Sequence, residues 1–195
     1  MKIDITHNFK TKSHDLEGLF KGVKTLSHFM RNLEKQSLID PDRYSTNKYL
    51  GDGFEFFIEL LLKLHPTDNR LGVYNYSPIL ENDNGVDGIG ININLESSVV
   101  QIKYRSNKKS MLTATNDHLA NLFSDGMLTH NVTSDNDNPK NFRHFVFTTA
   151  DGLHFYTDKE MFKHKVKTFG YKDIKNLVDK NLIFWDTLRT IIKNI

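Results

Sequence analysis

The sequence predicts an α/β fold, with a mixed αβ core between helical segments at both ends of the chain. Three patterns support this prediction: an amphipathic helical stretch near the start, two alternating strands close together in the middle, and helical stretches up to the C-terminus. The 195 residues fit one domain with additions rather than two full domains. We divide the chain into an N-terminal helical segment (1–48), a core (49–156) and C-terminal helices packed on the core (157–195).

Composition and charge narrow the classes of function. The chain has no Cys, which excludes thiolate zinc sites and thiol nucleophiles and leaves carboxylates, His, Lys and hydroxyls. The net charge is only +2, so any contact with nucleic acid must come from local clustering of basic residues. No apolar run reaches the roughly 18–20 residues that span a bilayer, and no signal core follows the first Lys. We therefore expect no membrane partner and a cytoplasmic location, or the interior of a host cell if the protein is viral.

The first third of the chain predicts two helices. Apolar residues recur at three- and four-residue steps from 15 to 38, and Ser13 or Asp15 could cap this helix. Residues 39–48 are typical of a loop. A second helix, at 52–65, is apolar on nearly every side, which predicts a buried position. It carries Glu55 and Glu59, one turn apart, and each needs a cation, a metal or solvent because burial of an unpaired carboxylate is costly.

The middle of the chain predicts strands. Residues 71–79, 86–94 and 98–106 have the composition or alternation of strands, and the last two are joined by a short turn, which predicts a hairpin. In the strand at 98–106, one face should carry Gln101, Lys103 and Arg105.

Helices and one strand are expected in the second half. A basic loop at 107–110 leads to a helix at 113–123 that stops near Gly126, and its start, at 113–118, could approach a phosphate or form an ordinary cap. A polar loop at 129–141 precedes a strand at 142–150. Three helices should follow, at residues 158–169, 172–181 and 182–195.

The hairpin and the buried helix hold the residues that could carry chemistry. Hydrolysis of a phosphodiester needs a hard cation, which prefers carboxylate, amide and carbonyl oxygens. Asp87, the Gln101 side chain and the Ile102 carbonyl can supply such oxygens. Lys103, two residues after Gln101, can orient water or stabilise the developing negative charge.

These residues resemble those of a known family. Glu55 within GFEFF, GVDG at 85–88 and VQIKYR at 100–105 are similar to the motifs of the PD-(D/E)xK nuclease superfamily, in particular its Mrr-like restriction endonuclease branch with a QxK motif. The resemblance covers residues 50 to 150. It implies a restriction-endonuclease-like mixed sheet flanked by helices, and hydrolysis of DNA with Mg²⁺, for which Mn²⁺ could substitute. It also implies site residues: Asp87, Gln101, Ile102 and Glu55 at the metal, with Lys103 as the motif lysine.

The chain departs from the family pattern at two positions. Val86 stands where a Pro is usual, at a position that contributes no ligand. Gln101 replaces an acid, and since an amide binds a hard cation more weakly than a carboxylate, Glu55 would have to supply the missing charge, with Glu59 as a further candidate.

Each candidate residue also has a plainer interpretation. An Asp-Gly pair before a strand is a common turn signal, and a Lys on an amphipathic strand is usually solvated. Glu59 is expected at the surface or beside Lys63, and the scattered His are expected to be structural or exposed. Arg105, Lys108 and Lys109 are the candidates for contacts with the DNA backbone, although a solvated basic loop explains the two lysines equally well.

Two further functions stay open beside the Mg²⁺-dependent endonuclease. One is a nuclease-fold module that binds DNA with little or no turnover, which the Gln101 replacement favours. The other is a phage or homing-type nuclease that cuts at a specific site. A homodimer is also expected, since enzymes that cut both strands commonly use two-fold symmetry.

Overall fold

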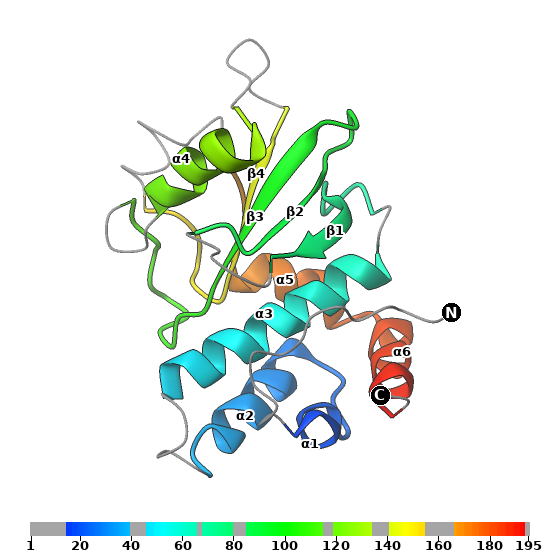
Figure 1. The fold of residues 1–195 in the computed structure, drawn as a ribbon. Coiled ribbons are helices and arrows are strands. Elements are labelled where there is room, and N and C mark those ends of the chain that lie inside the picture. Colours follow the sequence, from blue (N-terminus) through cyan, green and yellow to red (C-terminus); the bar gives the residue numbers. More distant parts are fainter. Residues whose placement is uncertain are drawn as a thin grey trace.

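The protein contains a five-stranded mixed sheet with helices on both faces (Figure 1). The computed structural model describes residues 15–39, 46–65, 68–79, 85–114, 119–133, 141–154 and 166–193. The α/β class and the mixed sheet predicted from the sequence are therefore confirmed. The strands are β1 (Tyr74–Pro78), β2 (Gly88–Ile91), β3 (Ser97–Lys103), β4 (His144–Thr148) and β5 (Val166–Phe169).

The strands lie in the sheet in the order in which they occur in the chain. β1, β2 and β3 pair antiparallel, and β4 and β5 continue the sheet in parallel to β3. The predicted hairpin is confirmed, because β2 and β3 pair from Ile91↔Ser97 to Gly88↔Val100. The strand expected at 142–150 is β4, which lies beside β3 and brings Phe147 opposite Ile102. The central position of β3 makes it the best-supported strand of the sheet.

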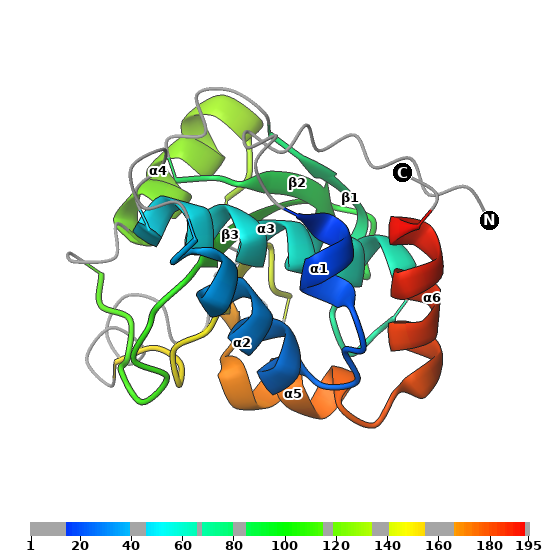
Figure 2. The ribbon, with the colours of Figure 1, turned by 90° about the horizontal axis from the view of Figure 1, so that it is seen from below.

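Two helices cover opposite faces of β3. The long helix α3 (Thr46–Leu64) contacts β1 and β3 on one face, and α4 (Leu119–His130) contacts β3 on the other. Figure 1 shows α1, α2 and α6 on the far side of α3 from the sheet, and Figure 2 shows the same layer from below. The bounds of these three helices are α1 (Leu16–Phe20), α2 (Leu26–Gln36) and α6 (Leu182–Ile192), and α5 (Tyr171–Val178) contacts α2, α6 and β5.

The helix expected over residues 15–38 is in fact two helices. α1 ends at Phe20 and α2 begins at Leu26, and between them Gly22 has φ +67°, a left-handed conformation that glycine adopts without strain. The periodicity continues through this turn because Val23, inside it, is also fully buried. The expected cap is correct, since the Asp15 carboxylate accepts a hydrogen bond from the Gly18 N–H at 2.9 Å.

Three other boundaries differ from the sequence prediction. α3 begins at Thr46, six residues before the expected start, so part of the loop predicted at 39–48 is helical, while residues 40–45 lie outside the described part. α4 continues past Gly126, where a β-carbon would lie 3.2 Å from Val99 Cγ2, so this glycine permits close packing on β3 and does not end the helix. The start predicted for this helix includes residues 115–118, which lie outside the described residues.

The last part of the chain contains one strand that the sequence prediction missed. Residues 166–169, expected as the end of a helix, form β5 at the edge of the sheet. The strand has no period-two alternation to predict it from, because Val166 and Phe169 are buried in the two different hydrophobic clusters, with Lys167 and Thr168 half-buried between them. α5 and α6 agree with the two following helical predictions.

One hydrophobic core joins α3 to the helices at both ends of the chain. Phe57 of α3 is fully buried, and its ring stacks on Phe29 of α2 at 4.8 Å and on Trp185 of α6 at 5.8 Å between centroids. A second cluster, under α4, fills the other face of the sheet and includes Val99 and Leu122. Among the helices in the described ranges, none is long and apolar enough to cross a membrane.

Candidate functional site

The Asp87 carboxylate lies where strands β2 and β3 stop pairing. The last ladder pair is Gly88↔Val100, and beyond it the Asp87 N–H donates to the Val100 carbonyl at 2.9 Å. The Asp87 side chain then turns toward β3 and accepts a hydrogen bond from the Ile102 N–H at 2.5 Å. The carboxylate therefore takes the place of a backbone acceptor at the open end of the hairpin.

The Ile102 carbonyl faces the same edge of β3 as Asp87. Val99 donates to Arg143 and Lys103 accepts from Thr149, so odd-numbered residues of β3 direct their backbone groups toward β4. Because these directions alternate along a strand, the N–H and C=O of Ile102 point toward the β2 edge. The site thus has a carboxylate and a backbone carbonyl on one edge of the same strand.

Tyr76 of β1 lies beneath this edge, and sequence reasoning did not identify it. A β-carbon at Gly88 would come within 2.3 Å of the Tyr76 ring, so the second glycine of GVDG makes room for this side chain. Burial and then the nearby carboxylates of Asp87, Glu59 and Glu55 raise the pKa of the Tyr76 phenol well above its usual range. These carboxylates, from a hairpin and a helix, therefore converge around one buried phenol.

A cleft of about 360 Å³ lies between α3 and the end of β3. From Tyr49 to Leu62 every residue of α3 is buried except Gly51 and Glu55, which both face this cleft. The opposite wall is the chain from Ile102 to Ser106, and it includes Lys103 and Arg105. Within the described part of the chain Lys103 forms no ion pair, so its ammonium is not neutralised by a neighbouring carboxylate.

Gln101, like Asp87, does not line this cleft. Its side chain is fully buried, and its Nε2 atom lies 3.4 Å from the position that a β-carbon of Gly85 would take. Neither polar atom of this amide has a hydrogen-bond partner among the described residues. A buried amide without partners is costly, so Gln101 holds an unused oxygen beside the segment that leads into Asp87.

Glu59 is buried, with only 1% of its surface exposed, and its carboxylate is paired with the Lys63 ammonium. The pairing with Lys63 is confirmed, and the expected position at the surface is wrong. The reason is that α3 is covered on nearly all sides. Each acid in its buried segment is therefore held by an ion pair or faces the cleft.

The three basic residues expected to contact DNA have different surroundings. Arg105 lines the cleft, and its guanidinium donates to the Tyr104 carbonyl at 2.6 Å. The Lys108 ammonium lies 4.9 Å from the centre of the Tyr171 ring and 3.9 Å from a Glu34 carboxylate oxygen, so it has two intramolecular partners. Lys109 is exposed. The structure therefore brings Glu55, Ile102, Lys103 and Arg105 to one cleft, with Asp87 bonded to its wall.

The described residues contain no group of three or more His, Asp or Glu side chains arranged to hold a metal ion. A cation at the hairpin would therefore need oxygens of other kinds, which the Ile102 carbonyl and the Gln101 amide can supply.

The helix wall of the cleft also contains two residues that sequence reasoning did not identify. Asn47 and Gly51 precede Glu55 by eight and four residues, so they lie along one face of the helix. This spacing was the signal that could have identified them.

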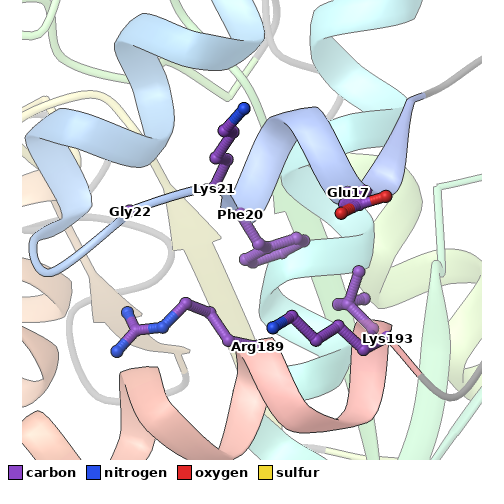
Figure 3. A pocket seen from close by; sticks show the side chains of 7 residues that line it. Glu17, Phe20, Lys21, Gly22, Arg189 and Lys193 are labelled. Atoms are coloured by element: carbon purple, nitrogen blue, oxygen red, sulfur yellow. The ribbon is translucent and has the colours of Figure 1, made fainter.

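A second hollow, of about 220 Å³, lies between α1 and α6 (Figure 3). The Phe20 ring lies between the two helices, with Arg189 of α6 and Lys193, which directly follows α6, below it. The Arg189 guanidinium donates to the Val23 carbonyl and pairs with Asp186, so its charge fastens α6 to the turn after α1. None of the described residues that line this hollow lines the cleft beside the hairpin.

Comparison of the chain with protein-family models, with curated proteins and with solved structures found no match.

Proposed function

We propose that this protein is a divalent-metal-dependent endonuclease that hydrolyses phosphodiester bonds in DNA, with a restriction-endonuclease-like fold. The observation that carries the proposal is the Asp87 carboxylate bonded to the Ile102 N–H at the open end of the hairpin, next to a cleft that contains Glu55 and Lys103. Asp87 before β2, and Gln101 and Lys103 on β3, follow the order of the PD-(D/E)xK motif, with Gln101 in place of its second acid.

The residues present fit a hard cation such as Mg²⁺. Asp87 and Glu55 supply negative charge, and the Ile102 carbonyl and the buried Gln101 amide supply neutral oxygens. The Gln101 amide has no hydrogen-bond partner among the described residues, and a ligand bound to its oxygen would explain this. A bound Mg²⁺ would lower the pKa of water and neutralise charge on the phosphate.

The reaction that these residues support is attack of water on the phosphorus of a phosphodiester. The bond from phosphorus to the 3′ oxygen breaks, a proton is transferred to that oxygen, and the products carry 5′-phosphate and 3′-hydroxyl ends. Lys103 would hold the attacking water or stabilise the negative charge that grows on the phosphate oxygens. Arg105, on the same wall, would bind the phosphate backbone of the DNA.

Incubation of purified protein with supercoiled and single-stranded DNA, in Mg²⁺ or Mn²⁺, tests the proposal. We expect nicking or degradation that EDTA abolishes and that Asp87→Asn reduces by about 10²-fold or more. Glu17→Gln, which changes an exposed acid on α1, is a matched control and should cut like the wild type. The wild type leaving both DNAs intact in both metals would contradict the proposal.

A DNA-binding module with little or no turnover is the second candidate. The neutral Gln101 favours it, because two carboxylates at a metal give weaker binding than three. Binding of DNA without metal-dependent cleavage would support this candidate. A single reproducible cut position would instead support a site-specific nuclease, and the mass of the protein in solution, with and without DNA, tests the expected homodimer.

A further inference from the structure

Gly51 lies in the second turn of α3, at the wall of the cleft, and packing against the described residues does not explain it. Gly is the costliest residue after Pro in the interior of a helix, because it loses the most backbone freedom on folding. A β-carbon at Gly51 would meet no atom within 4 Å, whereas a β-carbon at Gly126 in α4 would meet Val99 at 3.2 Å. Its cost to the helix is therefore not offset by a close contact within the described part of the protein.

The empty space at Gly51 belongs to the cleft that contains Glu55 and Lys103. Asn47, Gly51 and Glu55 follow each other at four-residue steps, so they form one stripe about 12 Å long on the surface of α3. A side chain at the middle position would project between the two ends of this stripe. With glycine at this position, no side chain fills the space beside Glu55.

The chemistry around this space fits a nucleic-acid strand. The wall opposite Gly51 carries Lys103 and Arg105, and the exposed polar side chains of Asn47 and Ser106 lie at the mouth. Cations with neutral hydrogen-bonding groups are the usual contacts of a sugar-phosphate backbone. Among the described residues that line the cleft, Glu55 is the single acid, and the proposed function assigns it to the metal.

We propose that Gly51 is a substrate-clearance position, at which the sugar-phosphate backbone next to the scissile phosphate lies directly against α3, with Asn47 as its contact farther along the helix. This inference rests on the proposed function, since it assumes that DNA occupies the cleft. It assigns Gly51 a role in positioning the substrate and no part in the chemical step.

Two variants of Gly51 test the inference, with Asn176→Ala as the matched control. Gly51→Ala and Gly51→Leu fill the space to different extents, and both should keep the fold because nothing described lies in the way. Asn176 is exposed on α5 and does not line the cleft. Its replacement by Ala also favours a helix, so it controls for that effect. The readouts are the melting temperature, cleavage in Mg²⁺, and binding of a fluorescein-labelled 20-nucleotide DNA, single-stranded and duplex, by anisotropy in Ca²⁺.

We expect Gly51→Ala to raise the melting temperature by about 2–4 °C and yet to weaken DNA binding. Gly51→Leu should weaken DNA binding further, by about tenfold or more, with a parallel loss of cleavage. Asn176→Ala should bind and cut like the wild type. A gain of stability with a loss of binding at one position is an outcome that a merely structural glycine would not give.

The failures of the two proposals are distinguishable. If the wild type cuts DNA and both Gly51 variants bind and cut equally well, the clearance role is overturned and the nuclease stands. If the wild type neither binds nor cuts DNA, the proposed function fails and the clearance role fails with it. If Gly51→Leu unfolds, Gly51→Ala alone decides the question.

Discussion

At the scale of single residues, the hairpin shows why short motifs are hard to interpret. Asp87 precedes a glycine, as turn residues often do, but its carboxylate bonds to a backbone N–H on the neighbouring strand. Gln101 lies on a strand with alternating polar residues, yet it is fully buried. For both residues the sequence identified the position and the structure supplied the environment.

Lys103→Ala tests the role of the lysine in the chemical step. We expect a loss of cleavage of about 10²-fold or more, with DNA binding within a few-fold of the wild type, because the ammonium acts mainly on the developing charge. Lys180→Ala, which removes an exposed lysine in the turn between α5 and α6, is the control and should behave like the wild type. A Lys103→Ala variant that cuts at a nearly normal rate would refute the assigned role.

Gln101→Glu tests whether this side chain is a metal ligand. In EDTA the variant should melt at a lower temperature than the wild type, because a carboxylate is costly at a fully buried position. In Mn²⁺ it should recover more stability than the wild type, because a carboxylate binds the cation more strongly than an amide does. Calorimetry and thermal melts measure both effects. Equal responses of the two proteins to Mn²⁺ would show that residue 101 is not a ligand.

At the scale of elements, the C-terminal end of α3 connects the helix of the site to α6. The helix presents Glu55 to the cleft and ends near His65, whose ring stacks on Phe184 of α6 at 5.5 Å. Burial lowers the pKa of His65 below its ordinary value of 6.5, and it exceeds the opposing effect of Asp68. A neutral imidazole is therefore part of the contact between α3 and α6.

His65→Gln should reduce the dependence of stability on pH. Since the folded pKa is lowered, the unfolded chain binds the proton more readily, and the contribution of His65 is fully present above pH 6.5 and is lost as the pH falls below that value. The free energy of unfolding of the wild type should thus decrease more between pH 7.5 and pH 5 than that of the variant. Urea denaturation at several pH values measures this free energy. Parallel curves of the free energy of unfolding against pH for the two proteins would contradict the prediction.

At the scale of the whole molecule, the helical additions share one core with the sheet. Phe57 contacts Phe29 of α2 and both Phe184 and Trp185 of α6, so aromatic packing joins segments at the two ends of the chain. The Trp185 indole N–H also donates to the Val178 carbonyl at 2.9 Å, which fixes α6 to the end of α5. The N-terminal helices thus bury their apolar faces within the same chain.

Phe57→Ala should destabilise the entire protein by about 3–5 kcal/mol. Because the segments share this core, unfolding should occur in one transition. Fluorescence of Trp185, the single Trp of the chain, reports on α6, and far-ultraviolet circular dichroism reports on all helices and strands. The two signals should have the same midpoint in wild type and variant, and separate midpoints would show that the outer helices unfold independently.

The sequence by itself determined the α/β class, the hairpin, the buried helix and the group of candidate residues, because periodicity and spacing are local properties. Only the tertiary structure decided what depends on neighbours far apart in the chain. It places Tyr76 beneath Gly88, buries Glu59 beside Lys63, turns residues 166–169 into an edge strand and gives Gly51 its open space. The physical reason is that burial, pairing and clearance are set by what packs against a residue, and the printed order of the chain does not contain that information.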